Sequence, residues 1–291
     1  MNYPQTVQEL TDTLRQGNYL ADRGLATAVF VAMSLQRPIL LEGEVGVGKT
    51  ELAKVVSSVF GRKLIRLQCY EGIDTNQALY EWDYARQLLY IRALSDRDIG
   101  GEEAVEKLFG PRFLLERPLM QAVKEGDQAV LLIDEVDRAD DEFEAFLLEV
   151  LSDFQISIPE VGTIKAERPP LVILTSNRTR ELHDALKRRC MYHWIGYPEP
   201  DREVDIVTVQ APEVSAALAH KVVTAVNRLR EMDLAKPPGV AETIDWARTL
   251  SFLGESDLST ATADATLGSV IKERDDLELV RDNLSEVTSH A

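Results

Sequence analysis

The sequence has no apolar run long enough to cross a membrane, and it has little positive charge. Its strongly apolar stretches, such as 28–33 and 129–133, fall far short of the roughly 20 residues that a spanning helix needs. The 49 acidic residues outnumber the 32 lysines and arginines, which gives a formal net charge of −17. Nucleic acids and anionic membrane surfaces bind to a local positive field, so this composition disfavours both as partners.

Cysteine is also scarce. Cys69 and Cys190 lie far apart in the chain and match no metal-binding spacing, so buried thiols in a reducing compartment are the simplest interpretation. The N-terminus shows no charged segment followed by an apolar run, which predicts that no signal peptide is present. Together these absences predict a cytoplasmic protein.

The 291 residues suffice for one large domain or two ordinary ones, and 45% of them are hydrophobic. Short apolar runs of strand length alternate with helical patterns, which is typical of a parallel sheet covered by helices. The predicted strands lie at 39–41, 64–67, 129–133, 171–174 and 192–195.

Two segments do not fit plain helical crossovers. Residues 83–117 are too long for a tight loop, and the alternating polarity of 155–167 about a turn at 159–162 predicts a β-hairpin. Pro198 and Pro200 end the strand pattern, and the chain beyond them has helical periodicity. We therefore predict an α/β core over 1–200, with an insert at 83–117, followed by an all-helical domain over 201–291.

Residues 43–50 read GEVGVGKT and fit the pattern GxxxxGK[ST], with a predicted strand before them and a predicted helix after them. Glycines let the backbone curl so that its N–H groups point at a phosphate, and the helix N-terminus adds a positive dipole end. Lys49 is expected to reach the β- and γ-phosphates of ATP, and Thr50 to bind Mg²⁺. The candidate nucleotide-binding residues are Gly43, Glu44, Val45, Gly46, Val47, Gly48, Lys49 and Thr50.

Two carboxylates follow the predicted strand 129–133, at the sheet edge where α/β proteins bind ligands. Asp134 is expected to hold Mg²⁺, and Glu135 to orient and deprotonate an attacking water. Asn177 follows the next strand, where its amide would hydrogen-bond the γ-phosphate or that water. The alternative for Asn177 is a local turn.

A basic run, 187–189, ends a helical stretch. One interpretation is a cationic helix end that complements the helix dipole. The other is an arginine finger that reaches the γ-phosphate bound by a neighbouring subunit, and Arg188 and Arg189 are both candidates for it.

These motifs, in this order and followed by helices, resemble an AAA+ ATPase. The segments LLEGEVGVGKT (40–50) and DEVDRA (134–139) are similar to the MoxR branch of that family. Residues 65–72 and 80–82 are similar to its CoxD-like subgroup, which is tied to carbon monoxide dehydrogenase maturation. The resemblance implies a P-loop AAA+ core with a five-stranded parallel sheet, a helix-2 insert, a pre-sensor-1 hairpin and an all-α lid domain.

The resemblance also implies a function. It predicts a Mg²⁺-dependent ATPase that works as a homo-oligomeric ring, a hexamer, and that remodels or matures a client protein such as a metalloenzyme. It further implies a partner with a von Willebrand factor A domain, and neither nucleic acid nor membrane as a ligand. Two alternatives stay open: an AAA+ loader or helicase acting on nucleic acid, and a nucleotide-gated scaffold without useful hydrolysis.

One position departs from the MoxR pattern. Thr243 stands where the resemblance predicts a sensor-2 arginine at the start of a lid helix. Arg248 lies about a turn and a half further on and is a candidate substitute, or else a residue on a solvated face. The sequence leaves the coupling between the lid and the nucleotide open.

Overall fold

The computed structural model describes residues 4–94, 108–159 and 161–289, so part of the predicted insert lies outside the described residues. The chain divides into two compact units, which we call the sheet unit and the helical unit. The sheet unit comprises Met1–Thr13, Asp22–Glu42 and Leu52–His193, and the helical unit comprises Leu14–Ala21, Gly43–Glu51 and Trp194–Ala291. The predicted domain boundary near residue 200 stays a prediction.

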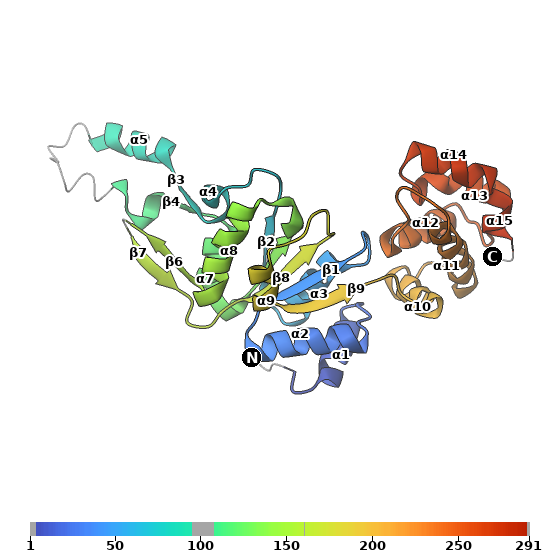
Figure 1. Ribbon diagram of the computed structural model, residues 1–291, viewed down its shortest axis with the longest axis horizontal. Helices are drawn as coiled ribbons and strands as arrows, with labels where there is room; N and C mark the ends of the chain where they lie inside the picture. Colours follow the sequence, from blue (N-terminus) through green and yellow to red (C-terminus); the bar gives the residue numbers. More distant parts are fainter. Residues whose placement is uncertain (1–3, 95–107, 160, 290–291) are drawn as a thin grey trace. The chain divides into compact units, whose positions relative to one another are not determined.

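A five-stranded parallel sheet with the order β2-β5-β8-β1-β9 organises the sheet unit (Figure 1). All five strands predicted from the apolar runs are confirmed. They are β1 (Ile39–Gly43), β2 (Lys63–Gln68), β5 (Ala129–Asp134), β8 (Leu171–Ser176) and β9 (Met191–Ile195). Every residue of β1, β5 and β8 is buried, as expected for central strands covered on both faces.

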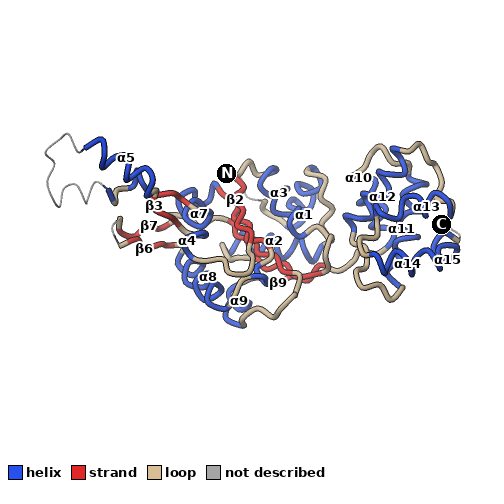
Figure 2. Tube along the Cα trace, turned by 90° about the horizontal axis from the view of Figure 1, so that it is seen from above, coloured by secondary structure: helices blue, strands red, loops and turns tan. Residues whose placement is uncertain are grey.

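Helices lie on both sides of these strands (Figure 2). The sheet unit contains all or most of α1 (Val7–Gln16), α2 (Arg23–Leu35), α3 (Lys49–Val59), α4 (Thr75–Ala78), α5 (Tyr84–Leu94), α7 (Pro118–Glu125), α8 (Asp141–Asp153) and α9 (Asp184–Arg189). Helix α8 begins where the Asp140 carboxylate accepts the backbone N–H of Phe143 at 2.9 Å. Its buried face, which includes Phe143, Leu147 and Val150, packs into the same hydrophobic core as β5 and β8.

Two short antiparallel hairpins accompany the main sheet. The hairpin predicted at 155–167 is present as β6 (Gln155–Ile158) and β7 (Gly162–Lys165), with Ile156 opposite Ile164. A second hairpin pairs β3 (Tyr80–Trp82) with β4 (Leu114–Glu116), close to the ends of the insert, and was not predicted.

The helical unit contains α10 (Pro200–Gln210), α11 (Ala216–Glu231), α12 (Val240–Phe252), α13 (Thr260–Thr266), α14 (Arg274–Asp282) and α15 (Leu284–Thr288). Its own core includes Val222, Val226 and the fully buried Trp246. The helical pattern predicted beyond residue 200 is thus confirmed. Within the described ranges, no helix combines the length and the apolar character needed to cross a bilayer.

A buried ion pair links two helices of the helical unit. Arg230 donates to both carboxylate oxygens of Glu203, at 2.6 and 2.8 Å, and the two side chains are 7% and 0% exposed. The Thr243 hydroxyl donates to the same carboxylate at 2.7 Å, and the Arg230 guanidinium lies 4.2 Å from the centroid of the Tyr197 ring.

The Arg230→Ala substitution is expected to lower the free energy of unfolding of the helical unit by about 3–5 kcal/mol, because it leaves the buried Glu203 charge without its counter-ion. Urea denaturation followed by circular dichroism measures this loss. Arg274→Ala is the matched control, since Arg274 is 88% exposed and its pair with Glu278 should contribute at most about 0.5 kcal/mol. Equal losses in the two variants would contradict the expectation.

Candidate functional site

The predicted phosphate loop, 43–50, follows β1 and runs into α3. Gly46 and Gly48 have φ angles of +75° and +91°, a region in which residues with a Cβ are strained. The buried Lys49 ammonium donates to the carbonyl oxygens of Gly43 and Glu44, at 2.8 and 2.6 Å. The loop is therefore curled around its own lysine, and the lysine ammonium and the glycine backbone form a cradle that suits a phosphate group.

The start of α12 packs directly on this loop within the helical unit. The backbone N–H of Ala241 donates to the Gly46 carbonyl at 3.0 Å, and a Cβ built on Gly239 would collide with the carbonyl oxygen of Val45. The Glu242 carboxylate caps the helix by accepting the N–H of Gly239 at 3.0 Å. The phosphate loop and the first turn of this helix are thus in backbone contact.

Neither candidate at the sensor-2 position brings a cation to the loop. The Thr243 hydroxyl is buried and donates to Glu203 and to the Gly239 carbonyl. The Arg248 guanidinium pairs with Glu213 at 3.2 Å and donates to the carbonyl of Gln210. Both side chains are engaged with the helices around them.

Asp134 and Glu135 lie at the end of β5 in the sheet unit, as predicted. The buried Asp134 carboxylate accepts the Thr175 hydroxyl at 2.5 Å, and that hydroxyl in turn accepts the backbone N–H of Glu135 at 2.9 Å. On its other oxygen, Asp134 pairs with Arg66 at 2.6 Å. The Thr175 side chain therefore fixes the Asp134 carboxylate relative to the backbone that carries Glu135.

Glu135 has a φ of +53°, which is uncommon for a residue other than glycine. Its carboxylate accepts the Gln68 amide at 3.1 Å and pairs with Arg138 at 3.2 Å. A strained backbone conformation that the surroundings maintain is typical of functional sites.

Asn177 lies at the end of β8, next to β5. The parallel register places Leu174 opposite Ile133, so the residues that follow the two strands meet at the same sheet edge. The backbone N–H of Asn177 donates to the Asp137 carboxylate at 3.2 Å. The structure therefore brings Asp134, Glu135 and Asn177 together in the sheet unit.

The two candidate finger residues differ in their contacts. Both lie at the end of α9, and their carbonyl oxygens accept hydrogen bonds from Arg37. The Arg189 guanidinium donates to the Ser152 hydroxyl, whereas the exposed Arg188 guanidinium bonds to no side chain or carbonyl in the part of the chain that the structure describes.

The Asp134 carboxylate fits a magnesium ion. Mg²⁺ is bound in proteins through one or two carboxylates together with phosphate oxygens and waters, and Asp134 offers such a carboxylate in a place that already attracts the Arg66 cation. In the helical unit, Thr50 carries a hydroxyl directly after the lysine of the phosphate loop.

The model of the AAA domain (dynein-related subfamily) matches residues 38–190, more than half of the chain. The chain belongs to this AAA family. This chain is 26% identical over 235 residues to an uncharacterized protein of Staphylococcus saprophyticus. The match covers 78% of this chain and 80% of that protein. It is 30% identical over 184 residues to an uncharacterized protein of Staphylococcus aureus, covering 61% and 62% of the two chains.

Solved structures similar to the AAA chain include two mutants of RuvB from Thermotoga maritima. Their TM-scores are 0.52 and 0.51, at 16% and 15% identity, and each match covers 99% of this chain and 81% of the RuvB chain. At this identity the likeness concerns the fold alone, and it agrees with the α/β AAA+ core predicted from the sequence.

Burial raises the pKa of the Cys69 thiol to about 12, and the negative charges of Asp134 and Asp137 contribute to this rise. Burial alone raises the pKa of Cys190 to about 12. Both thiols of this AAA protein therefore stay protonated at neutral pH, which agrees with the interpretation of unreactive buried cysteines.

Three polar residues at this site were not predicted from the sequence: Arg66, Gln68 and Thr175. Arg66 and Gln68 lie two positions apart on β2, so their side chains point to the same side of the strand. The available signal was their position at or near the ends of predicted strands. Parallel strands end at a common edge of the sheet, where their last polar residues come together.

Proposed function

We propose that the chain is a Mg²⁺-dependent ATPase that works as a homo-oligomeric ring, a hexamer. The observation that carries the proposal is the group of Asp134, Glu135 and Asn177 at adjacent strand ends, in a chain that belongs to an AAA family. The glycine-rich loop that encloses Lys49 supplies the expected phosphate cradle.

The proposed mechanism assigns one task to each group. The loop 43–50 binds the phosphates of ATP, and Thr50 and Asp134 hold the Mg²⁺ that neutralises phosphate charge. Glu135 accepts a proton from the water that attacks the γ-phosphate, and the Asn177 amide orients that water or the γ-phosphate. An arginine from the neighbouring subunit stabilises the charge that develops on the γ-phosphate.

Within the AAA family we propose membership of the MoxR branch and its CoxD-like subgroup, with a client protein as the target of remodelling. The segments 40–50 and 134–139 support the branch. Helix α5 of the insert supports a protein client, because it exposes a set of large apolar side chains. These are Tyr84, Leu88, Leu89 and Ile91. We further propose that the client is a metalloenzyme and that a protein with a von Willebrand factor A domain is a partner. Neither nucleic acid nor a membrane is a proposed ligand.

Phosphate release from ATP tests the proposal directly. The purified protein should release phosphate only with Mg²⁺ present, and EDTA should stop the release. Stimulation by DNA would instead favour a machine acting on nucleic acid.

Lys49→Ala is expected to weaken ATP binding at least about tenfold, because the loop loses the ammonium that pairs with the β- and γ-phosphates. Titration with a fluorescent ATP analogue measures the dissociation constant. Lys54→Ala, an exposed lysine on the same helix, is the matched control and should bind ATP like the parent. Equal affinities of the parent and Lys49→Ala would refute the phosphate-loop assignment.

A nucleotide-gated scaffold is the second candidate function. It is favoured by the engagement of Thr243 and Arg248 with the surrounding helices, which leaves neither of these two side chains to supply a lid cation for the nucleotide. ATP binding without phosphate release, both alone and with the partner protein, would support the scaffold over the ATPase.

A further inference from the structure

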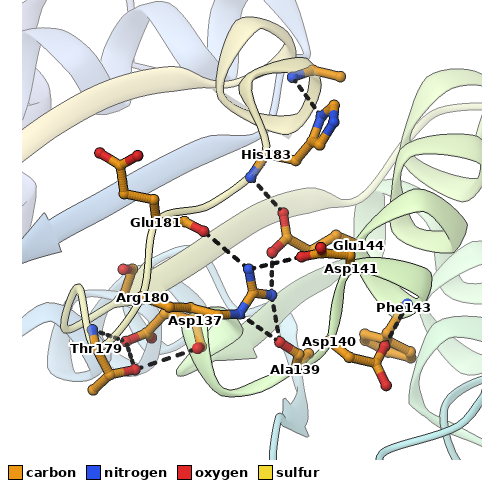
Figure 3. Close-up of polar contacts among 12 residues, drawn as sticks. Asp137, Ala139, Asp140, Asp141, Phe143, Glu144, Thr179, Arg180, Glu181 and His183 are labelled. Carbon is orange, nitrogen blue, oxygen red and sulfur yellow. Dashed lines mark hydrogen bonds and ion pairs between the residues drawn. The ribbon is translucent and has the colours of Figure 1, made fainter.

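A buried carboxylate, Asp137, joins the segments that follow β5 and β8. The residue is 2% exposed. One carboxylate oxygen accepts the backbone N–H of Asn177 at 3.2 Å, and the other accepts the N–H and the hydroxyl of Thr179 at 2.8 and 2.7 Å. Figure 3 shows Asp137 and Thr179 facing each other across this junction.

Arg180 lies on the loop after β8, and its side chain contacts the segment that follows β5. Its guanidinium donates to the carbonyl of Ala139 and pairs with the fully buried carboxylate of Glu144 on α8 (Figure 3). Glu144 also accepts the backbone N–H of His183 at 2.8 Å. Asp137, in the turn after β5, and Glu144, on α8, therefore hold the loop after β8 at two points.

Besides these contacts, the buried side chain of Leu182 anchors the loop in the hydrophobic core of the sheet unit. Residues 177–183 form no helix or strand, and Arg178 has a φ of +57°, which residues other than glycine seldom adopt. The η3 turn (Val136–Arg138), which carries Asp137, starts directly after Glu135. Asp137 thus connects the backbone of Asn177 to the turn that adjoins the proposed base.

We propose that Asp137 is a positioning residue for Asn177, and that the Arg180–Glu144 pair holds the loop so that this contact persists. A catalytic amide must be fixed to within a fraction of an ångström, and a buried carboxylate that accepts backbone N–H groups supplies such a restraint. The consequence for catalysis rests on the proposed ATPase function, whereas the restraint itself does not require it.

Hydrogen–deuterium exchange in the nucleotide-free protein tests the restraint. Asp137→Asn keeps the size of the side chain but removes its charge and one acceptor, so the amides of Asn177 and Thr179 should exchange about tenfold faster. Asp141→Asn is the matched control, since Asp141 is 87% exposed and contacts Arg180 but not Asn177. Unchanged protection of these amides in Asp137→Asn would overturn the proposal, whatever the turnover.

Thr179→Val is a second variant that leaves the buried carboxylate in place. It removes only a hydroxyl that donates to Asp137, on a residue that is itself exposed, so exchange at Asn177 should rise about threefold with the fold retained. No rise in either variant contradicts the assignment.

A double-mutant cycle tests the consequence for turnover. Asp137→Asn should lower kcat about tenfold and leave KM for ATP within about twofold, and it should lower kcat little further in an Asn177→Ala background. Additive losses would show that Asp137 does not act through Asn177. A parent protein that binds ATP and never hydrolyses it would count against the proposed function, and the exchange measurement would still decide the restraint.

Discussion

Glu135→Gln is expected to lower ATP turnover by about 10²–10⁴-fold and to leave ATP binding intact, because the amide has nearly the same shape but cannot accept the proton of the attacking water. The oxygen of the new side chain can still accept the Gln68 amide that Glu135 accepts at 3.1 Å. The strained backbone at this position, with its φ of +53°, is unaffected by the change of side chain. The loss should therefore concern kcat and not the fold.

Phosphate release and titration with a fluorescent ATP analogue separate these effects. Glu142→Gln, an exposed residue in the first turn of α8, is the matched control and should retain the parent's turnover. The Glu135→Gln protein should also accumulate as an ATP-bound assembly, which makes it the variant of choice for capturing the client. Parental turnover in Glu135→Gln would refute the assignment of the base.

Arg188→Ala is expected to lower turnover by about 10³-fold or more, as the loss of an arginine finger does in phosphoryl transfer. Arg189→Ala should stay within a few-fold of the parent, because the Arg189 guanidinium already bonds to Ser152 in its own chain. Steady-state phosphate release from the two variants, compared at equal concentration, measures the difference. The opposite ranking would make Arg189 the finger.

A mixture of two inactive variants shows whether the finger acts between subunits. In a ring assembled from equal amounts of Arg188→Ala and Glu135→Gln, about a quarter of the sites combine an intact base with an intact finger from the neighbour. The mixture should therefore recover about a quarter of the parental turnover. A mixture as inactive as its components would contradict a finger supplied in trans.

The fold was predictable where its signal is local. The central strands β1, β5 and β8 were predictable because strands buried on both faces of a parallel sheet show as apolar runs. The edge strands β2 and β9 are partly exposed and were predictable from their length and from the glycine or proline near them. The hairpin β3–β4 was not predictable in the same way. Its strands are three residues long and pair across more than thirty residues, so neither shows a pattern of its own.

The residues of the candidate site were likewise predictable only where the sequence signal is local. The phosphate loop and Asp134–Glu135 were predicted because each is a contiguous motif whose spacing carries the chemistry. Asp137 and Arg180 were not predicted, because their partners lie about forty residues away on the neighbouring segment. Only the register of β5 against β8 brings these residues into contact.

The backbone contact between the phosphate loop and α12 couples the shape of the loop to the core of the helical unit. Ala241 donates its backbone N–H to the Gly46 carbonyl, and Trp246, Ala247 and Leu250 of the same helix are buried in that core. A change in the path of the loop at Gly46 would therefore act on the packing of the whole helical unit, because a close-packed core transmits strain.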